Sequence, residues 1–281
     1  MLKLIERNIA AVGERLVLLP PPDSCVPEYF KNATIDSSRH DELIAEMQRL
    51  RGSIYLHDGA VQSEHLSSDG LHQTPEDRKS WHLLMLDKYR RVSSCVWYLE
   101  HDNMTSVDEL RVRNSPLGRQ EDWRGKLRHA VESELALARR DRLHYAEVGG
   151  WAVSARSRCT SEGLLLALAA YSLGRILGGA LGITTATSRH SSSSILRRLG
   201  GSHLEVDGLH LPPYYDPKYK CQMELLRFDS RKPDAKYAGL IELLRDKLAS
   251  VSVIASAAAA AASPASYAYF AASDAQPQFA V

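Results

Sequence analysis

The sequence predicts a mixed α/β protein with a central sheet. An apolar stretch at 160–177 with helical character separates two strand-like runs at 145–153 and 181–187. Two further runs, 81–86 and 92–99, are separated by a short polar turn. The first pattern is typical of a β-α-β unit and the second of an antiparallel hairpin. Together they predict an α/β (α+β) fold, a mixed central sheet of about seven strands with flanking helices.

The other elements are expected in the same alternating order. Apolar residues recur at helical spacing in 41–50 and 120–140, and a short helix is expected at 191–200. Strands are expected at 52–56, 203–206 and 223–228. The polar segment 56–80 is broken by glycine and proline, so we expect a long loop of the kind that borders functional sites.

Three segments divide the chain. Residues 1–39 are expected to be an N-terminal extension, and 40–250 the functional domain. Residues 251–281 are rich in alanine and hold few large apolar side chains, so a disordered tail is expected there. A marginal polyalanine helix docked onto the body is the alternative.

Composition excludes several classes of protein. The 281 residues include 35 basic and 34 acidic ones, and the net charge of +1 offers no overall field for nucleic acid or an anionic membrane. No stretch approaches a signal peptide or a membrane span, which predicts a cytoplasmic protein. The four cysteines are scattered and the histidines lack ligand spacing, so no metal is expected.

The turn between the strand at 145–153 and the following helix is the best candidate for a ligand site. A helix start at Thr160 or Ser161 offers free backbone N–H groups and the positive end of the helix dipole, which together bind phosphate. Arg156 and Arg158 add local positive charge. Gly149-Gly150 inside the strand predicts a bulge where a ligand approaches the backbone.

These residues resemble the GNAT acyltransferase superfamily, whose fourth strand ends in A-V and is followed by R-G-x-G-x-G/A at a helix start. Here Ala152-Val153 precedes Arg158 and Gly163, which match, whereas Cys159 and Ser161 replace glycines. The resemblance implies the GNAT fold and an acyl-thioester donor, acyl-CoA or acyl-acyl carrier protein. The residues implied as donor contacts are Trp151, Val153, Arg156, Arg158, Thr160, Ser161 and Gly163.

The downstream residues are similar to one branch of that superfamily. Leu196 stands where many members have a tyrosine as general acid, and the acyl-homoserine lactone and N-acyl amino acid synthases also lack that tyrosine. Glu147 is similar to the glutamate of their E-x-x-R-F-x-V segment, and Asp77 and Asp69 to acids of their D-x-x-x-x-Y-L-L segment. The resemblance therefore implies Glu147 and Asp77 as catalytic residues, with Asp69 and His190 as substrate contacts.

Each assignment has a plainer alternative. Glu147 could form a salt bridge with a nearby arginine, Asp77 could be a solvated loop acid, and the turn could be an ordinary helix cap. His190 precedes a run of serines, and capping of the short helix is the preferred interpretation of it. Cys159 beside Arg158 should have a lowered thiol pKa, so an acyl-cysteine intermediate is a further alternative to direct transfer.

The sequence therefore predicts an N-acyltransferase that moves an acyl group longer than acetyl from a thioester to the amine of an amino acid or similar small molecule. Acyl carrier protein is the expected protein partner. The alternatives are a degenerate GNAT-like domain that binds a ligand or partner without turnover, and an acetyltransferase acting on protein lysines.

Overall fold

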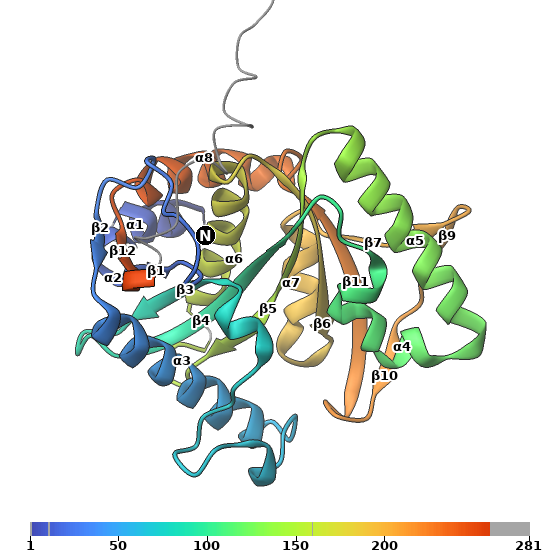
Figure 1. Ribbon diagram of the computed structural model, residues 1–281, viewed down its shortest axis with the longest axis horizontal. Coiled ribbons are helices and arrows are strands. Elements are labelled where there is room, and N and C mark those ends of the chain that lie inside the picture. Colours follow the sequence, from blue (N-terminus) through green and yellow to red (C-terminus); the bar gives the residue numbers. More distant parts are fainter. Residues whose placement is uncertain (1, 11, 159, 259–281) are drawn as a thin grey trace, which may run out of the picture.

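Strands from both ends of the chain meet in one mixed sheet (Figure 1). The computed structural model describes residues 2–10, 12–158 and 160–258. Within them the main sheet has ten strands, in the order β10-β11-β6-β5-β4-β3-β1-β12-β2 with β7 beside β11, and β8 and β9 form a separate hairpin. The strands are β1 (Leu16–Leu19), β2 (Ala33–Ile35), β3 (Trp81–Leu86), β4 (Val92–His101), β5 (His144–Val153), β6 (Ala180–Thr187), β7 (Ser202–His203), β8 (Glu205–Val206), β9 (Leu209–His210), β10 (Tyr214–Asp216), β11 (Cys221–Asp229) and β12 (Ser252–Ala255).

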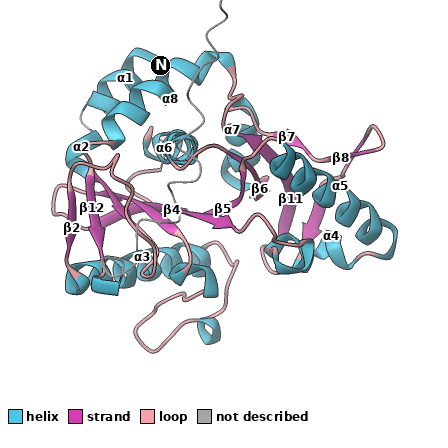
Figure 2. Ribbon diagram, turned by 45° about the horizontal axis from the view of Figure 1, so that its top comes forward, coloured by secondary structure: helices cyan, strands magenta, loops and turns pink. Residues whose placement is uncertain are grey.

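Helices cover both faces of the sheet (Figure 2). They are α1 (Leu2–Ala10), α2 (Val12–Arg15), α3 (Ser37–His57), α4 (Pro116–Arg119), α5 (Glu121–Arg140), α6 (Glu162–Ile176), α7 (Ser192–Arg198) and α8 (Ala235–Leu248). Helices α1, α6, α7 and α8 pack on one face, whereas α3 and α5 lie on the other, over different halves of the sheet. Helix α6 is apolar on most of its surface because it lies between the sheet and α8.

The predicted fold class and most predicted elements are confirmed. Strands β3 and β4 form the antiparallel hairpin, and β5, α6 and β6 form the β-α-β unit with parallel strands. Gly178 and Gly179 both have positive φ and end α6. The long loop expected at 56–80 connects α3 to β3 and contains two short 3-10 turns, Ser63–His65 and Pro75–Arg78.

Three expectations are wrong. Residues 52–56 do not form a strand, because α3 continues through them to His57 and buries Arg51 and Gly52 beneath the following loop. The boundary at residue 251 also fails, because Ser252–Ala255 form β12 between β1 and β2, where Val253 is fully buried. Residues 1–39 contribute β1 and β2 to the same sheet, which makes it larger than the seven strands expected. The rest of the alanine-rich segment, from 259, lies outside the described residues.

Strands β5 and β6 separate partway along their length. Their parallel pairing runs from His144 to Glu147 on β5 and ends at Ile183 on β6, although both strands continue. Just beyond, the Thr184 hydroxyl donates a hydrogen bond to the Val148 carbonyl at 2.7 Å. The sheet therefore opens on the carboxyl side of Glu147.

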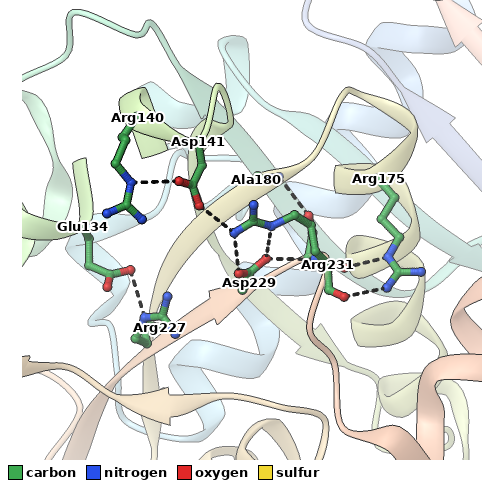
Figure 3. A network of polar contacts seen from close by, with 9 residues as sticks. Glu134, Arg140, Asp141, Arg175, Ala180, Arg227, Asp229 and Arg231 are labelled. Carbon is green, nitrogen blue, oxygen red and sulfur yellow. Dashed lines mark hydrogen bonds and ion pairs between the residues drawn. The ribbon is translucent and has the colours of Figure 1, made fainter. Parts of the chain in front are cut away.

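A polar network closes the opposite end of the same strands (Figure 3). Asp229 at the end of β11 accepts two hydrogen bonds from the Arg231 guanidinium, which also reaches Asp141 after α5. Arg175 of α6 donates to the Ser230 carbonyl at 2.6 Å. The network fastens α5, α6 and β11 together where β5 and β6 are paired, so the opening is confined to one end.

Candidate functional site

A cavity of about 1080 Å³ lies where β5 and β6 part. Its wall includes β5 from Glu147 to Val153, β6 from Ile183 to Thr187, the end of α3, the loop that follows α3, and the turn between β5 and α6. Basic side chains in the wall outnumber acidic ones, which favours an anionic ligand. The basic residues are Arg51, Arg111, Arg119, Arg158, Arg189, Arg198 and Lys218, and the acidic ones are Asp58, Glu76, Glu147 and Asp216.

Glu147 lies in this wall, at the last position of β5 that pairs with β6. Its side chain is buried and accepts three hydrogen bonds, two of them from the backbone N–H groups of Arg111 (3.1 Å) and Val112 (3.3 Å). The third partner is Nε2 of His101 on β4, 3.1 Å from Oε2. The carboxylate therefore has a fixed orientation, and among the described residues its partners are a histidine and two backbone N–H groups, whereas the salt-bridge alternative required an arginine side chain.

His101 and Trp97 are site residues that sequence reasoning missed. Both lie on β4 and reach β5 across the sheet, and only the strand register brings them there. The Arg111 guanidinium lies over the Trp97 ring, 5.0 Å from its centroid, and pairs with Glu76 at 3.2 Å. Beside Glu147, the wall is thus aromatic and cationic.

The predicted bulge is present at Gly149-Gly150, where the register between β4 and β5 shifts. Gly150 has φ +64°, and a Cβ atom there would lie 2.2 Å from Trp97 Cδ1. At Gly149 a Cβ would lie 2.4 Å from the same indole. The glycines are therefore explained by the close approach of Trp97 to the backbone.

Most residues predicted to contact the donor line the cavity together. Trp151, Val153, Arg158, Thr160, Ser161 and Gly163 are in its wall, whereas Arg156 is exposed and not part of it. Ser161 precedes α6 without a side-chain cap, and its hydroxyl accepts a hydrogen bond from Asn8 Nδ2 at 2.6 Å. The predicted turn therefore faces the cavity, and α1 contacts it. Cys159 lies outside the described residues.

Arg158 and His190 converge on one carboxylate. Arg158 Nη2 lies 3.3 Å from Oδ2 of Asp58, and His190 Nε2 lies 3.5 Å from the same oxygen. Asp58 is the C-cap residue of α3, and its role was not predicted. The preferred role of His190 as a cap is not seen, because Ser191 occupies the N-cap position of α7 and no side chain bonds there.

Asp77 lies behind the cavity wall. It is buried, and the Arg51 guanidinium donates to both of its oxygens, at 2.8 Å and 2.6 Å. Gln48 Nε2, the Thr74 N–H and the Thr74 hydroxyl also donate hydrogen bonds to it. Asp77 therefore acts as an anchor for Arg51, which itself lines the cavity, and not as a solvated acid. Asp69 is exposed in the loop and does not line the cavity.

His72 connects that anchor to the cavity. Arg51 Nε donates to His72 Nδ1 at 3.2 Å, which requires the neutral imidazole. Burial and the nearby Arg51 charge lower the pKa of His72 to about 4. The ring packs edge-on against Tyr55, 5.5 Å away, so α3 and its loop form one rigid side of the cavity.

A second, apolar pocket of about 70 Å³ adjoins the cavity on the α6 side of the sheet. The two share Val148, Gly149, Trp151, Thr184 and Leu196. The other lining residues come mainly from α6, β4, β6 and β11 and include Val96, Tyr98, Ala167, Tyr171 and Phe228. An apolar chain could enter this pocket from the point where the strands separate.

The described residues include no group of three or more His, Cys, Asp or Glu side chains that could hold a metal ion. No helix in the described part of the chain is long and apolar enough to span a membrane.

Comparison with known proteins gives a likeness in structure alone. The sequence matches no protein-family model, and no curated protein matches it. The solved structure of BjaI, a CoA-dependent acyl-homoserine lactone synthase, with SAM and isopentyl-CoA superposes with a TM-score of 0.52 at 13% identity, covering 86% of this chain and 92% of that chain. TofI in a ternary complex with an inhibitor and MTA gives 0.51 at 12% identity, covering 83% and 99%.

FeeM, an N-acyl amino acid synthase from uncultured soil microbes, has a TM-score of 0.43 at 11% identity over 71% of this chain and 89% of that chain. The likeness to BjaI shows the fold: a mixed central sheet with flanking helices. This chain therefore has the GNAT-like fold seen in the acyl-homoserine lactone synthase BjaI.

Proposed function

We propose that this protein is an N-acyltransferase that moves an acyl group from a thioester to the amine of an amino acid or similar small molecule. The observation that carries the proposal is the position of Glu147, a buried and oriented carboxylate in the cavity wall where β5 and β6 separate. The fold, shared with acyl-thioester enzymes such as BjaI, agrees with it.

The donor would lie along the opened edge of β5. Arg158 and the start of α6 would hold its phosphate groups, since a guanidinium and helix N–H groups both bind phosphate well. Trp151 and Val153 would line the path of the pantetheine arm, and the apolar pocket beneath Trp151 would hold the acyl chain. The basic wall suits either acyl-CoA or the phosphopantetheine of acyl carrier protein.

Glu147 would act on the incoming amine. An ammonium group must lose a proton before it can attack, and a carboxylate within hydrogen-bond reach can accept that proton directly or through water. The amine nitrogen then bonds to the thioester carbonyl carbon, and the tetrahedral intermediate collapses as the C–S bond breaks. The thiolate leaves, a proton returns to sulfur, and an amide remains. Backbone N–H groups of β5 beyond its paired region would stabilise the oxyanion.

His101 and the N–H groups of Arg111 and Val112 fix the orientation of Glu147. Two of these donors bind Oε2, whereas Oε1 accepts only the 3.3 Å hydrogen bond from the Val112 N–H. Oε1 therefore keeps a free lone pair and is the oxygen best placed to meet an amine. His101 would therefore be a positioning residue.

The test is acyl transfer by the purified chain and its Glu147→Gln variant. Acyl-CoA and acyl-acyl carrier protein donors of several chain lengths are incubated with amino acids, and N-acyl products are identified by mass spectrometry. Loss of a general base typically lowers turnover by roughly 100-fold to 10,000-fold, so Glu147→Gln should show a loss in that range when turnover is measured per folded molecule. Normal turnover by the variant would refute the role of Glu147.

Binding without turnover is a second candidate function. It is favoured by the observation that Asp58 already pairs with Arg158, and Asn8 with Ser161, so two proposed donor contacts are engaged within the chain. A wild-type protein that binds acyl-thioesters in calorimetry but gives no product with any acceptor would establish this alternative.

A further inference from the structure

Asp58 connects three segments that line the cavity. Its carboxylate meets Arg158 from the turn between β5 and α6 and His190 from the loop between β6 and α7, while its carbonyl accepts a hydrogen bond from Arg189. Arg189 also donates to the Tyr219 carbonyl at 3.0 Å. A single acidic residue thus collects the cationic side chains of two loops that line the cavity.

The position of Asp58 is electrostatically unfavourable without those partners. It is the C-cap residue of α3, a helix of 21 residues whose C-terminus carries the negative end of the dipole. Acidic residues destabilise that end, where cations are preferred. Capping therefore does not account for an aspartate there, and its carboxylate interacts instead with Arg158 and His190.

We propose that Asp58 is an internal anion that competes with the donor's phosphate for Arg158 and His190. This inference rests on the proposed function, in which Arg158 binds the donor. The Asp58 carboxylate lies 3.3 Å from Arg158 Nη2 and 3.5 Å from His190 Nε2, and it is itself part of the cavity wall. Asp58 contacts Arg158 only through Nη2, and a phosphate that binds the guanidinium bidentately through Nη2 competes with Asp58 for that nitrogen.

Pyrophosphate can replace the Asp58 carboxylate as the partner of Arg158. A pyrophosphate brings more negative charge than one carboxylate and more acceptor oxygens. It also gains the helix start at Ser161 and Gly163, which lines the same cavity. Asp58, in contrast, is only partly buried, with a side-chain exposure of 17%, so its pair with Arg158 is weakened by solvent.

The loop that carries His190 is suited to two positions. His190 and Ser191 both adopt left-handed backbone conformations, with φ of +54° and +59°. Such conformations are costly for residues other than glycine and need contacts that hold them. Displacing Asp58 removes one of those contacts, so the loop can relax as the phosphate binds.

The test measures the affinity of the full chain for inorganic pyrophosphate by calorimetry. Asp58→Asn keeps the side-chain shape and removes the competing charge, and we expect pyrophosphate to bind about twofold to fivefold more tightly, the range for a partly exposed ion pair. Glu76→Gln is the matched control, since Glu76 lines the same cavity but pairs with Arg111. A general effect of net charge would change both variants equally.

A double-mutant cycle with Arg158→Gln completes the test. The proposal expects Arg158→Gln to weaken binding and to remove most of the gain from Asp58→Asn. Unchanged or weaker binding by Asp58→Asn, or an equal gain in Glu76→Gln, would overturn it. Asp58→Ala serves as a second variant if the asparagine fails to fold. Binding of pyrophosphate can be measured without acyl transfer. The competition by Asp58 can therefore be tested even if the protein proves to have no acyltransferase activity.

Discussion

Arg51 and Asp77 form a bidentate ion pair that is almost completely buried between α3 and the loop before β3. The Nη1–Oδ1 distance is 2.8 Å and the Nη2–Oδ2 distance is 2.6 Å, and both side chains are 3% exposed or less. Burial alone would raise the pKa of Asp77, but hydrogen bonds and charge from Arg51 hold that pKa below its usual value. The pair fixes Arg51 in the cavity wall.

Asp77→Asn is expected to act on stability. Removing one partner leaves Arg51 as a buried charge without compensation, and breaking such a pair costs about 3–5 kcal/mol. Urea denaturation should show that loss, while the rate of acyl transfer per folded molecule changes little. Asp108→Asn is the control, because its pairs with Arg128 and Arg113 are exposed and should matter little. A folded Asp77→Asn protein with normal stability and no turnover would restore the catalytic assignment.

Acid should destabilise the protein through its buried histidines. Burial lowers the pKa of His82 to about 4, and its Nδ1 atom has no hydrogen-bond partner among the described residues. The unfolded chain takes up this proton near pH 6.5, whereas the folded protein does not until about pH 4. The unfolded state therefore binds more protons between these values, and stability falls as the pH drops through that window.

The expected loss from His82 is of order 3 kcal/mol, and His72, with its pKa also lowered to about 4, adds to it. Urea denaturation at pH 7, 5.5 and 4.5 measures the slope. His82→Gln should flatten it, and His210→Gln, at an exposed position on β9, should not. Equal slopes in the wild type and His82→Gln would contradict the assignment.

Gly150→Ala is expected to damage both stability and the cavity. The substitution meets a positive φ and a steric clash with Trp97, so the indole or the bulge must move. Gly208→Ala separates the two effects, since Gly208 also has positive φ (+76°) but nothing lies within 4 Å of its Cβ position. Gly208→Ala should cost about 1–2 kcal/mol, and Gly150→Ala clearly more. Similar losses would show that Trp97 yields without cost.

Truncation distinguishes the two parts of the alanine-rich segment. Removing residues 259–281 leaves every described element in place, so the melting temperature should stay within a few degrees. Removing 252–281 also deletes β12, which hydrogen-bonds in parallel with β1 and β2 and buries Val253. That truncation should cost well over ten degrees, the expected scale for losing a buried strand that pairs on both sides within this sheet. A large loss from the shorter truncation would place a stabilising element beyond residue 258.

Local patterns explain why much of the fold was predictable. The hairpin of β3 and β4, the unit of β5, α6 and β6, and the turn at Arg158 are contiguous in sequence, and their apolar periodicity and glycines report on neighbours a few residues away. The prediction of a strand at 52–56 was wrong because α3 continues through these residues under a long loop. Tertiary packing there overrides the local preference of the residues for a strand.

The sequence by itself determined the fold class, the position of Glu147 on an opening strand and the location of the turn that lines the cavity. Only the tertiary structure decided the partners of those residues. His101 reaches Glu147 through strand register, Asp77 is buried by α3, and Asp58 meets Arg158 from 100 residues away. Charges so distant in sequence carry no local signal of their pairing, because their interaction energy depends on separation in space, which the packing of α3 against the sheet sets.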